Sequence, residues 1–132
     1  MMWLGIGAVM ALVSVAAGAF GAHGLRETLE PRAMEIFETA ARYQMYHALG
    51  LIAIGMLARG VKHRRWLNIA GFAMLVGIVV FCGSLYGLAL GAPSILGAVA
   101  PIGGTAFMLG WLALAVFAFG GRGSPAIDGI RP

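Results

Sequence analysis

Charge is scarce in this chain of 132 residues, of which only 11% are Asp, Glu, Lys or Arg and 61% are hydrophobic. So few charges cannot solvate the surface of a water-soluble globule of this size. The single cysteine, Cys82, excludes an internal disulfide. The sequence also has no Cys/His spacing typical of zinc, no phosphate-binding loop and no set of nucleophile and base. We therefore predict that the protein is not an enzyme.

Long apolar runs make up most of the chain. They cover residues 3–22, 43–58, 66–90 and 95–119. A bilayer core about 30 Å thick requires roughly 20 helical residues to cross it, and backbone amides in lipid must bond within their own helix. Three runs meet this length directly, and the second meets it when its helix is extended towards the N-terminus. We predict an all-α integral membrane four-helix bundle, with spans at about 3–23, 40–59, 66–90 and 98–119.

The segment before the second span carries an unusual pattern. Pro31 fits the first position of a helix, and no helix breaker follows before Leu57. The second helix is therefore expected to be about 27 residues long, or roughly 40 Å. Its first three turns carry Glu35 and Glu38 opposite an apolar face. They are predicted to form an amphipathic extension that lies in the membrane interface or projects from it.

Proline and tryptophan give further expectations. Pro101 falls six residues into the last apolar run, so the last span is predicted to begin near it, after a short re-entrant or interfacial turn over residues 95–100. Trp3 and Trp66 suit the interfacial belts of aromatic residues, whereas Trp111 is placed deep enough for packing between helices.

Basic residues are divided unevenly between the two ends of the predicted helices. The loop after the second span and the C-terminal tail hold six Lys and Arg residues, and the opposite side holds three. The positive-inside rule therefore places both termini in the cytoplasm, and we predict a multi-pass protein of the bacterial cytoplasmic (inner) membrane. Residues 121–132 are expected to form a mobile cytoplasmic tail. Because the basic residues sit at helix ends, the net charge of +4 does not indicate a nucleic-acid partner.

Small residues recur on one face of two predicted helices. They are Gly7, Ala11, Ser14, Gly18 and Gly21 in the first apolar run, and Gly83, Gly87 and Gly91 in the third. Such faces let helices approach closely in lipid. They predict either packing within the protein or the interface of a homo-oligomer.

Polar side chains in or next to the membrane are few, and the cost of placing them there makes each one a functional candidate. The candidates are His23, Glu38, Arg42, Tyr43, Gln44, His47, Ser84 and Tyr86. His23 and His47 are predicted to share one membrane face. Two imidazoles from facing helices suit a haem, and a histidine with Glu38 or Tyr43 suits a metal. The alternative is structural, with His23 capping its helix and His47 bonded to a neighbouring helix, and we expect no cofactor.

Several short motifs occur in a recognisable order. They are Gly18-Ala19-Phe20-Gly21-Ala22-His23-Gly24-Leu25, Phe37-Glu38-Thr39-Ala40, Tyr43-Gln44-Met45-Tyr46-His47-Ala48-Leu49, Gly83-Ser84-Leu85-Tyr86, Pro101-Ile102-Gly103-Gly104 and Gly110-Trp111. Over about residues 4–119 the chain resembles the domain-of-unknown-function 423 family of small inner-membrane proteins. The resemblance implies an integral membrane protein with about four helices and supplies no activity. It marks six of the polar candidates, all except Glu38 and Arg42.

These observations predict a non-enzymatic membrane protein that acts by association, as a homo-oligomer or as an accessory subunit of a larger membrane complex. The lipid bilayer is its expected surrounding, and nucleic acid is excluded. One alternative is a binder of a haem, a quinone or a metal at a face shared by His23 and His47. Another is a small passive pore. No Asp, Glu, Lys or Arg lies near the centre of a predicted span, which argues against an ion-coupled transporter.

Overall fold

The computed structural model describes residues 1–120, and the predicted mobile tail, residues 121–132, lies outside the described residues. Every regular element of the described part is helical, which confirms the all-α prediction there. The elements are α1 (Met2–Phe20), the π-helical turn η1 (Gly21–Leu25), α2 (Pro31–Leu57), α3 (Arg65–Gly77), the π-helical turn η2 (Ile78–Cys82), α4 (Gly83–Ala89) and α5 (Leu96–Phe119).

The two π-helical turns continue helices and do not end them. η1 extends α1 into one helix, Met2–Leu25, and η2 joins α3 to α4 in a second, Arg65–Ala89. These two helices and α5 are long and apolar enough to cross a membrane by length and composition. α2 does not reach the same apolarity, because its N-terminal half carries charged and polar residues. Residues 1–120 thus hold three candidate membrane-spanning helices.

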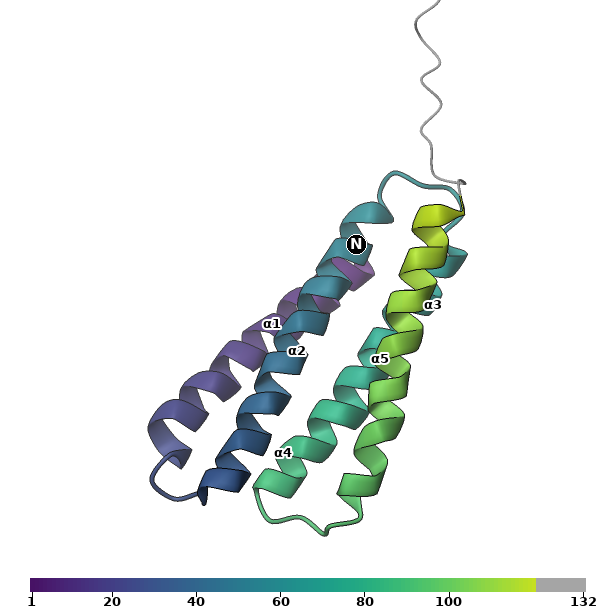
Figure 1. Ribbon diagram of the computed structural model, residues 1–132. Helices are drawn as coiled ribbons and strands as arrows, with labels where there is room; N and C mark the ends of the chain where they lie inside the picture. The colour runs from purple at the N-terminus through teal and green to yellow at the C-terminus, as the bar shows by residue number, and fades with distance from the viewer. Residues whose placement is uncertain (121–132) are drawn as a thin grey trace, which may run out of the picture.

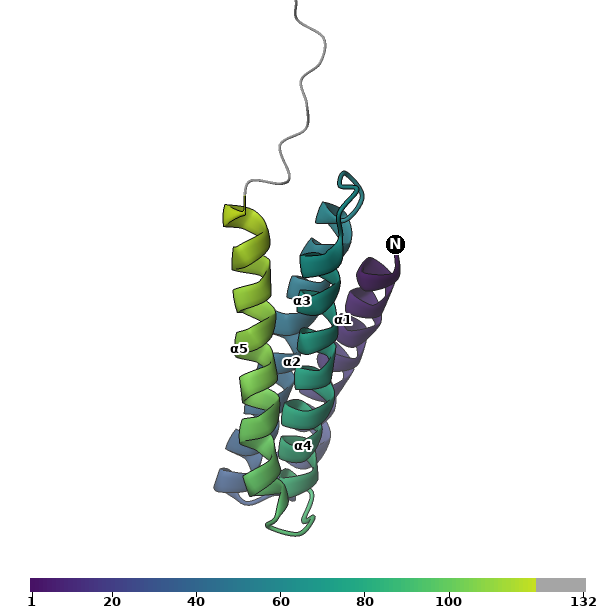
Figure 2. The ribbon, with the colours of Figure 1, turned by 90° about the vertical axis from the view of Figure 1, so that its right-hand side faces the viewer.

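The helices lie side by side along their lengths (Figures 1 and 2). α2 packs against α1 on one side and against the helix Arg65–Ala89 on the other, and α5 packs mainly against that second helix. The N-terminus, the α2–α3 loop and the end of α5 lie at one end of the molecule (Figure 1). The α1–α2 and α4–α5 connections lie at the opposite end. α2 therefore runs within the helical assembly for its whole length.

The start of α2 differs from the prediction. The 27-residue helix is present with the expected bounds, Pro31–Leu57. Its first three turns do not project, however, because their apolar face is covered by neighbouring helices. Met34 and Phe37 are buried. The Phe37 ring lies against Gly21 of η1 and meets the Tyr86 ring of α4 edge to face, with 5.0 Å between ring centroids. The amphipathic extension is thus an integral part of the packed helices.

The small residues of α1 are used mainly inside the protein. A Cβ atom added at Gly7 would come within 2.8 Å of the α2 backbone, and one added at Gly21 would come equally close to Phe37. Ser14 is buried and donates a hydrogen bond of 2.7 Å to the backbone oxygen of Ala41. Only Gly18 of these residues faces open space. Close packing of α1 on α2 therefore accounts for most of this stripe.

The start of α5 also differs from the prediction. Residues 96–100 form the first turns of a regular helix and not a separate re-entrant turn, with Pro101 inside the helix. Pro101 is the sixth residue of α5, beyond the first turn, so it removes one backbone hydrogen bond of the helix, the one that an amide at this position would donate to the oxygen of Gly97. The helix then contacts η2 closely at Gly103, where an added Cβ atom would clash with the Phe81 backbone.

Candidate functional site

Gln44 joins three helices through its side-chain amide. Its Nε2 donates a hydrogen bond of 2.9 Å to the backbone oxygen of Met10 on α1. Its Oε1 accepts a hydrogen bond of 2.8 Å from the Tyr86 hydroxyl on α4. Gln44 is only 3% exposed. Because the buried amide is hydrogen-bonded through both its nitrogen and its oxygen, it links α1, α2 and α4.

His47 points towards α5 instead. Its ring lies flat against Phe107, with ring centroids 3.4 Å apart and planes 12° from parallel. The Nδ1–H group donates a hydrogen bond of 2.7 Å to the backbone oxygen of Tyr43. A carbonyl oxygen can only accept, so Nδ1 carries the proton and Nε2 of the neutral ring is left as an acceptor.

A pocket of about 470 Å³ opens beside His47, between α2, η2 and α5. The lining residues are Tyr43, Tyr46, His47, Phe81, Gly104, Phe107, Met108 and Trp111. Its floor is buried, since His47 is 5% and Phe107 is 4% exposed. Its rim is open to the surroundings, since Tyr46 is 52% and Trp111 is 46% exposed. We call this hollow the His47 pocket.

No residue on the α5 side of the His47 pocket was among the predicted site residues. Gly104, Phe107, Met108 and Trp111 follow the spacing of one helix face, which is the signal that could have indicated a shared surface. Phe81 has no such signal, because its position depends on the π-helical turn η2. Such turns occur frequently at functional sites.

The remaining predicted site residues lie elsewhere. His23 is exposed on η1, at the same level as Gly21, whose Cα lies against Phe37. Phe37 and His47 are ten residues apart on α2, or about 15 Å along the helix axis. The structure therefore does not bring His23 and His47 together on one face. Ser84 is buried on α4. Residues 1–120 contain no group of three or more His, Cys, Asp or Glu side chains that could hold a metal ion.

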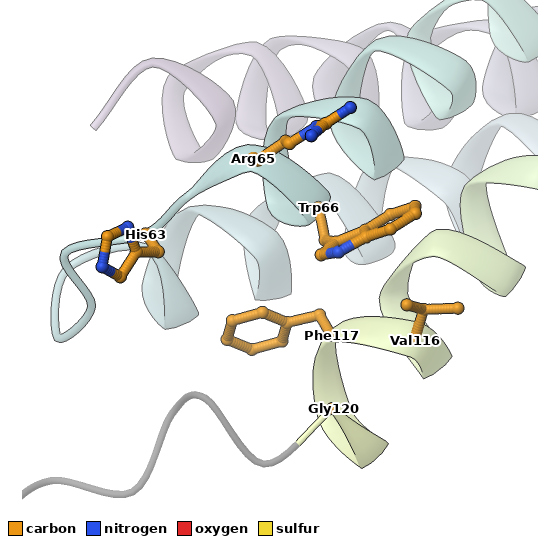
Figure 3. A pocket seen from close by; sticks show the side chains of 6 residues that line it. All are labelled: His63, Arg65, Trp66, Val116, Phe117 and Gly120. Carbon is orange, nitrogen blue, oxygen red and sulfur yellow. The ribbon is translucent and has the colours of Figure 1, made fainter.

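A second pocket lies at the C-terminal end of α5, near the α2–α3 loop (Figure 3). It has a volume of about 530 Å³ and is lined by His63, Arg65, Trp66, Val116, Phe117 and Gly120. Figure 3 shows the Trp66 and Phe117 side chains on the two sides of the gap, while the Arg65 side chain extends away from it. The walls are thus mainly apolar, and the pocket borders Gly120, the last residue that the structure describes.

One face of α2 is charged and uncovered. Its exposed residues are Glu35, Glu38, Arg42, Tyr46 and Leu49, which we call the outer α2 face. Glu35 pairs with Arg32 at 3.3 Å, with both side chains largely exposed. Within residues 1–120 no carboxylate lies within 4.0 Å of the Arg42 guanidinium, and no base lies that close to Glu38.

Comparison with known proteins identifies the family. Residues 17–104 match the model of DUF423, described as a protein of unknown function. The chain belongs to the DUF423 family. No solved structure matches it.

The relatives of this DUF423 chain are named as membrane proteins. A UPF0382 membrane protein of Staphylococcus epidermidis is 49% identical, covering 84% of this chain and 89% of the relative. The UPF0382 membrane protein YwdK of Bacillus subtilis is 43% identical over 86% and 92% of the two chains. A relative in Haemophilus influenzae is 37% identical over 89% and 93%. The chain is therefore a membrane protein of unknown function.

Membrane location makes the depth of Arg42 informative. The neighbouring residue Ala41 accepts the hydrogen bond from Ser14. Ser14 lies eleven residues before the end of the helix Met2–Leu25, or about 16 Å along its axis. The residues between Ser14 and the end of that helix include no Asp, Glu, Lys or Arg.

The helix Arg65–Ala89, on the other side of α2, likewise continues as an apolar segment beyond the level of Arg42. Tyr43 contacts Phe81, with 5.1 Å between ring centroids, and Phe81 lies eight residues before Ala89, or about 12 Å. This segment is also free of acidic and basic residues. Arg42 is therefore exposed at a depth where both neighbouring helices still present apolar surface, and so is Glu38, which lies one turn away on α2.

Proposed function

We propose that this protein is a non-catalytic, multi-pass protein of the bacterial cytoplasmic membrane that acts by association, through the outer α2 face, with a second copy of itself. In this proposal α2 crosses the membrane with the other helices, giving four spans. Its antiparallel run beside α1 supports this, as does the inward direction of its polar residues Gln44 and His47. A helix with such residues can cross a membrane when its neighbours shield them.

The exposure of Arg42 and Glu38 carries the proposal. Charged side chains within the bilayer are rare, and they almost always face the protein interior, a water-filled cavity or an opposite charge. An exposed arginine costs about 2.5–3.5 kcal/mol at the centre of a membrane helix on insertion scales, and less towards the interface. A protein surface that covers the outer α2 face would remove this cost and supply the missing opposite charge.

A second copy supplies that opposite charge without a further partner. Two copies related by a two-fold axis along the membrane normal present the same residues at the same depth. Glu38 and Arg42 are four residues apart on α2, or about 6 Å along the axis, which the long arginine side chain spans. Arg42 of each copy then meets Glu38 of the other. Tyr46 and Leu49 extend the contact with apolar surface.

Thiol crosslinking in native membranes tests the proposal. In a Cys82→Ser background, Leu49→Cys places the only thiol on the outer α2 face, and we expect oxidation to yield covalent dimers. Leu12→Cys is the matched control, because Leu12 is an apolar residue at least as exposed as Leu49 but belongs to α1. Dimers formed equally by both variants would indicate random collision and contradict the proposal.

A charge exchange then tests the ion pairs. Arg42→Glu should reduce the crosslinked fraction at Leu49→Cys at least tenfold, because two glutamates would then face each other. The double variant Glu38→Arg/Arg42→Glu restores opposite charges and should recover most of the dimer. Native mass spectrometry of the gently released protein gives an independent readout. A complex with a different polypeptide in place of a second copy would make the protein an accessory subunit and overturn the self-association.

A further inference from the structure

We infer that the His47 pocket binds an uncharged lipophilic molecule whose aromatic ring carries a hydroxyl group, that is, a quinol or phenol. This inference does not rest on self-association, because the pocket is formed within one chain by α2, η2 and α5. It also differs from a site shared by two histidines, since His23 takes no part in the pocket.

The hydrogen-bond acceptor is Nε2 of His47. The one hydrogen bond of this ring is made at Nδ1, whose proton goes to the Tyr43 backbone oxygen. Within residues 1–120, every completely buried side-chain nitrogen or oxygen has a hydrogen-bond partner. Because Nε2 of His47 has no such partner, it is not completely buried and retains contact with open space. The His47 pocket is the hollow that this ring lines. A fixed, neutral imidazole with a free acceptor suits a ligand that donates a hydrogen bond.

The aromatic lining favours a ring in the ligand. The ring centroids of Tyr43 and Phe81 are 5.1 Å apart in a tilted arrangement, and those of Phe81 and Phe107 are 5.6 Å apart, edge to face. The ring centroids of Trp111 and His47 are 5.9 Å apart. Aromatic groups at these separations attract a further ring by edge-to-face or offset stacking. A volume of about 470 Å³ lies within the range of small-molecule pockets, about 300–1,000 Å³.

The depth of the pocket selects against a charged ligand. Phe107 is the twelfth residue of the 24 in α5, so the pocket floor lies halfway along a candidate membrane span. A quaternary ammonium or a carboxylate at this depth would lose its hydration. The exposed rim on α5, formed by Met108 and Trp111, allows an uncharged molecule to enter sideways from the lipid.

Paired ligands test the inference. The probes are an alkyl hydroquinone with a ten-carbon chain and its dimethyl ether, which keeps the ring and the chain but cannot donate a hydrogen bond. Binding is measured by calorimetry in phosphatidylcholine nanodiscs, with empty nanodiscs as the reference for partitioning. We expect saturable binding of the hydroquinone, about tenfold tighter than that of the ether, as one hydrogen bond in a dry site provides.

His47→Phe keeps the stacked ring and removes the acceptor, so it should abolish the difference between the two probes. His63→Phe, on the loop beside the second pocket, is the matched control and should leave that difference unchanged. The ¹⁵N signal of His47 Nε2 in the unaltered protein gives a readout that does not depend on the folding of a variant. It should shift with the hydroquinone and not with the ether. Equal binding of both probes, or no uptake beyond that of empty nanodiscs, would overturn the inference.

Discussion

The Tyr86 hydroxyl donates a hydrogen bond of 2.8 Å to Oε1 of Gln44, and this contact joins α4 to α2 through two residues that are 42 positions apart in the chain. The same amide donates to the backbone of Met10, so one side chain joins α1, α2 and α4. Apolar burial does not drive helix association in lipid, and close packing and hydrogen bonds between helices take that part. Gln44 is therefore expected to be a structural residue.

Replacement of Gln44 by leucine should destabilise the protein by about 1 kcal/mol, because the Tyr86 hydroxyl loses its partner in a dry site. The measurement is unfolding in mixed micelles. A double-mutant cycle with Tyr86→Phe should give a coupling of about 0.6 kcal/mol, the average for hydrogen bonds between membrane helices. Thr105→Val is the control, because that exposed hydroxyl bonds only to its own helix, at Pro101. Additive effects of Gln44→Leu and Tyr86→Phe would contradict the bond.

The sequence identifies the helices well because their signals are local. Apolar runs locate the helices Met2–Leu25, Arg65–Ala89 and α5, and Pro31 marks the start of α2. The alternative that the first turns of α2 project from the other helices was wrong, since an amphipathic face indicates burial on one side without saying whether lipid headgroups or other helices cover it. Here Gly21 and Tyr86 cover Phe37.

The candidate site was harder to predict because neighbours in the sequence can face different helices. Gln44 and His47 are three residues apart, yet one is bonded to Tyr86 on α4 and the other is stacked on Phe107 of α5. Their directions differ by about 60° around α2, which is enough to reach different neighbours. Which helix lies in each direction depends on tertiary packing, and so does the separation of His23 from His47.

Gly103 should tolerate no side chain. A Cβ atom there would clash with the Phe81 backbone in η2, which cannot move away as a flexible side chain could. We expect Gly103→Ala to destabilise the protein by about 1–3 kcal/mol, as overpacking does. Gly83→Ala is the matched control, since a Cβ at this helical glycine meets nothing within 4 Å. It should be neutral or stabilising by up to about 1 kcal/mol from helix propensity. Equal effects of the two variants in an unfolding assay would contradict the close contact of α5 with η2.

The orientation of the chain should follow its basic residues. The α2–α3 loop holds Arg59, Lys62 and Arg64, and the α4–α5 loop at the opposite end holds no charge. We therefore expect a periplasm-dependent reporter, such as alkaline phosphatase, to be inactive after Pro132 and active when it is inserted after Pro93. A reporter that is active after Pro132 and inactive after Pro93 would show that the topology is the reverse of the predicted one. Activity at both positions would mean that α5 does not cross the membrane.

The three tryptophans should differ in their contact with lipid. Trp3 was expected in an interfacial belt but is 4% exposed, lies against Gly71 of α3 and donates a hydrogen bond of 3.0 Å to Asn68 Oδ1. Trp111 was expected between helices but is 46% exposed at the rim of the His47 pocket.

Lipids brominated near the middle of their acyl chains quench indole fluorescence on contact. They should therefore quench a Trp3→Phe/Trp66→Phe variant, which retains Trp111, far more than a Trp66→Phe/Trp111→Phe variant, which retains Trp3. The reverse order would place the Trp3 ring in contact with lipid and contradict its burial against Gly71 and Asn68 of α3. Weak quenching of Trp111 that strengthens in an Arg42→Glu background would indicate that self-association shields the pocket rim, linking the two surfaces of α2.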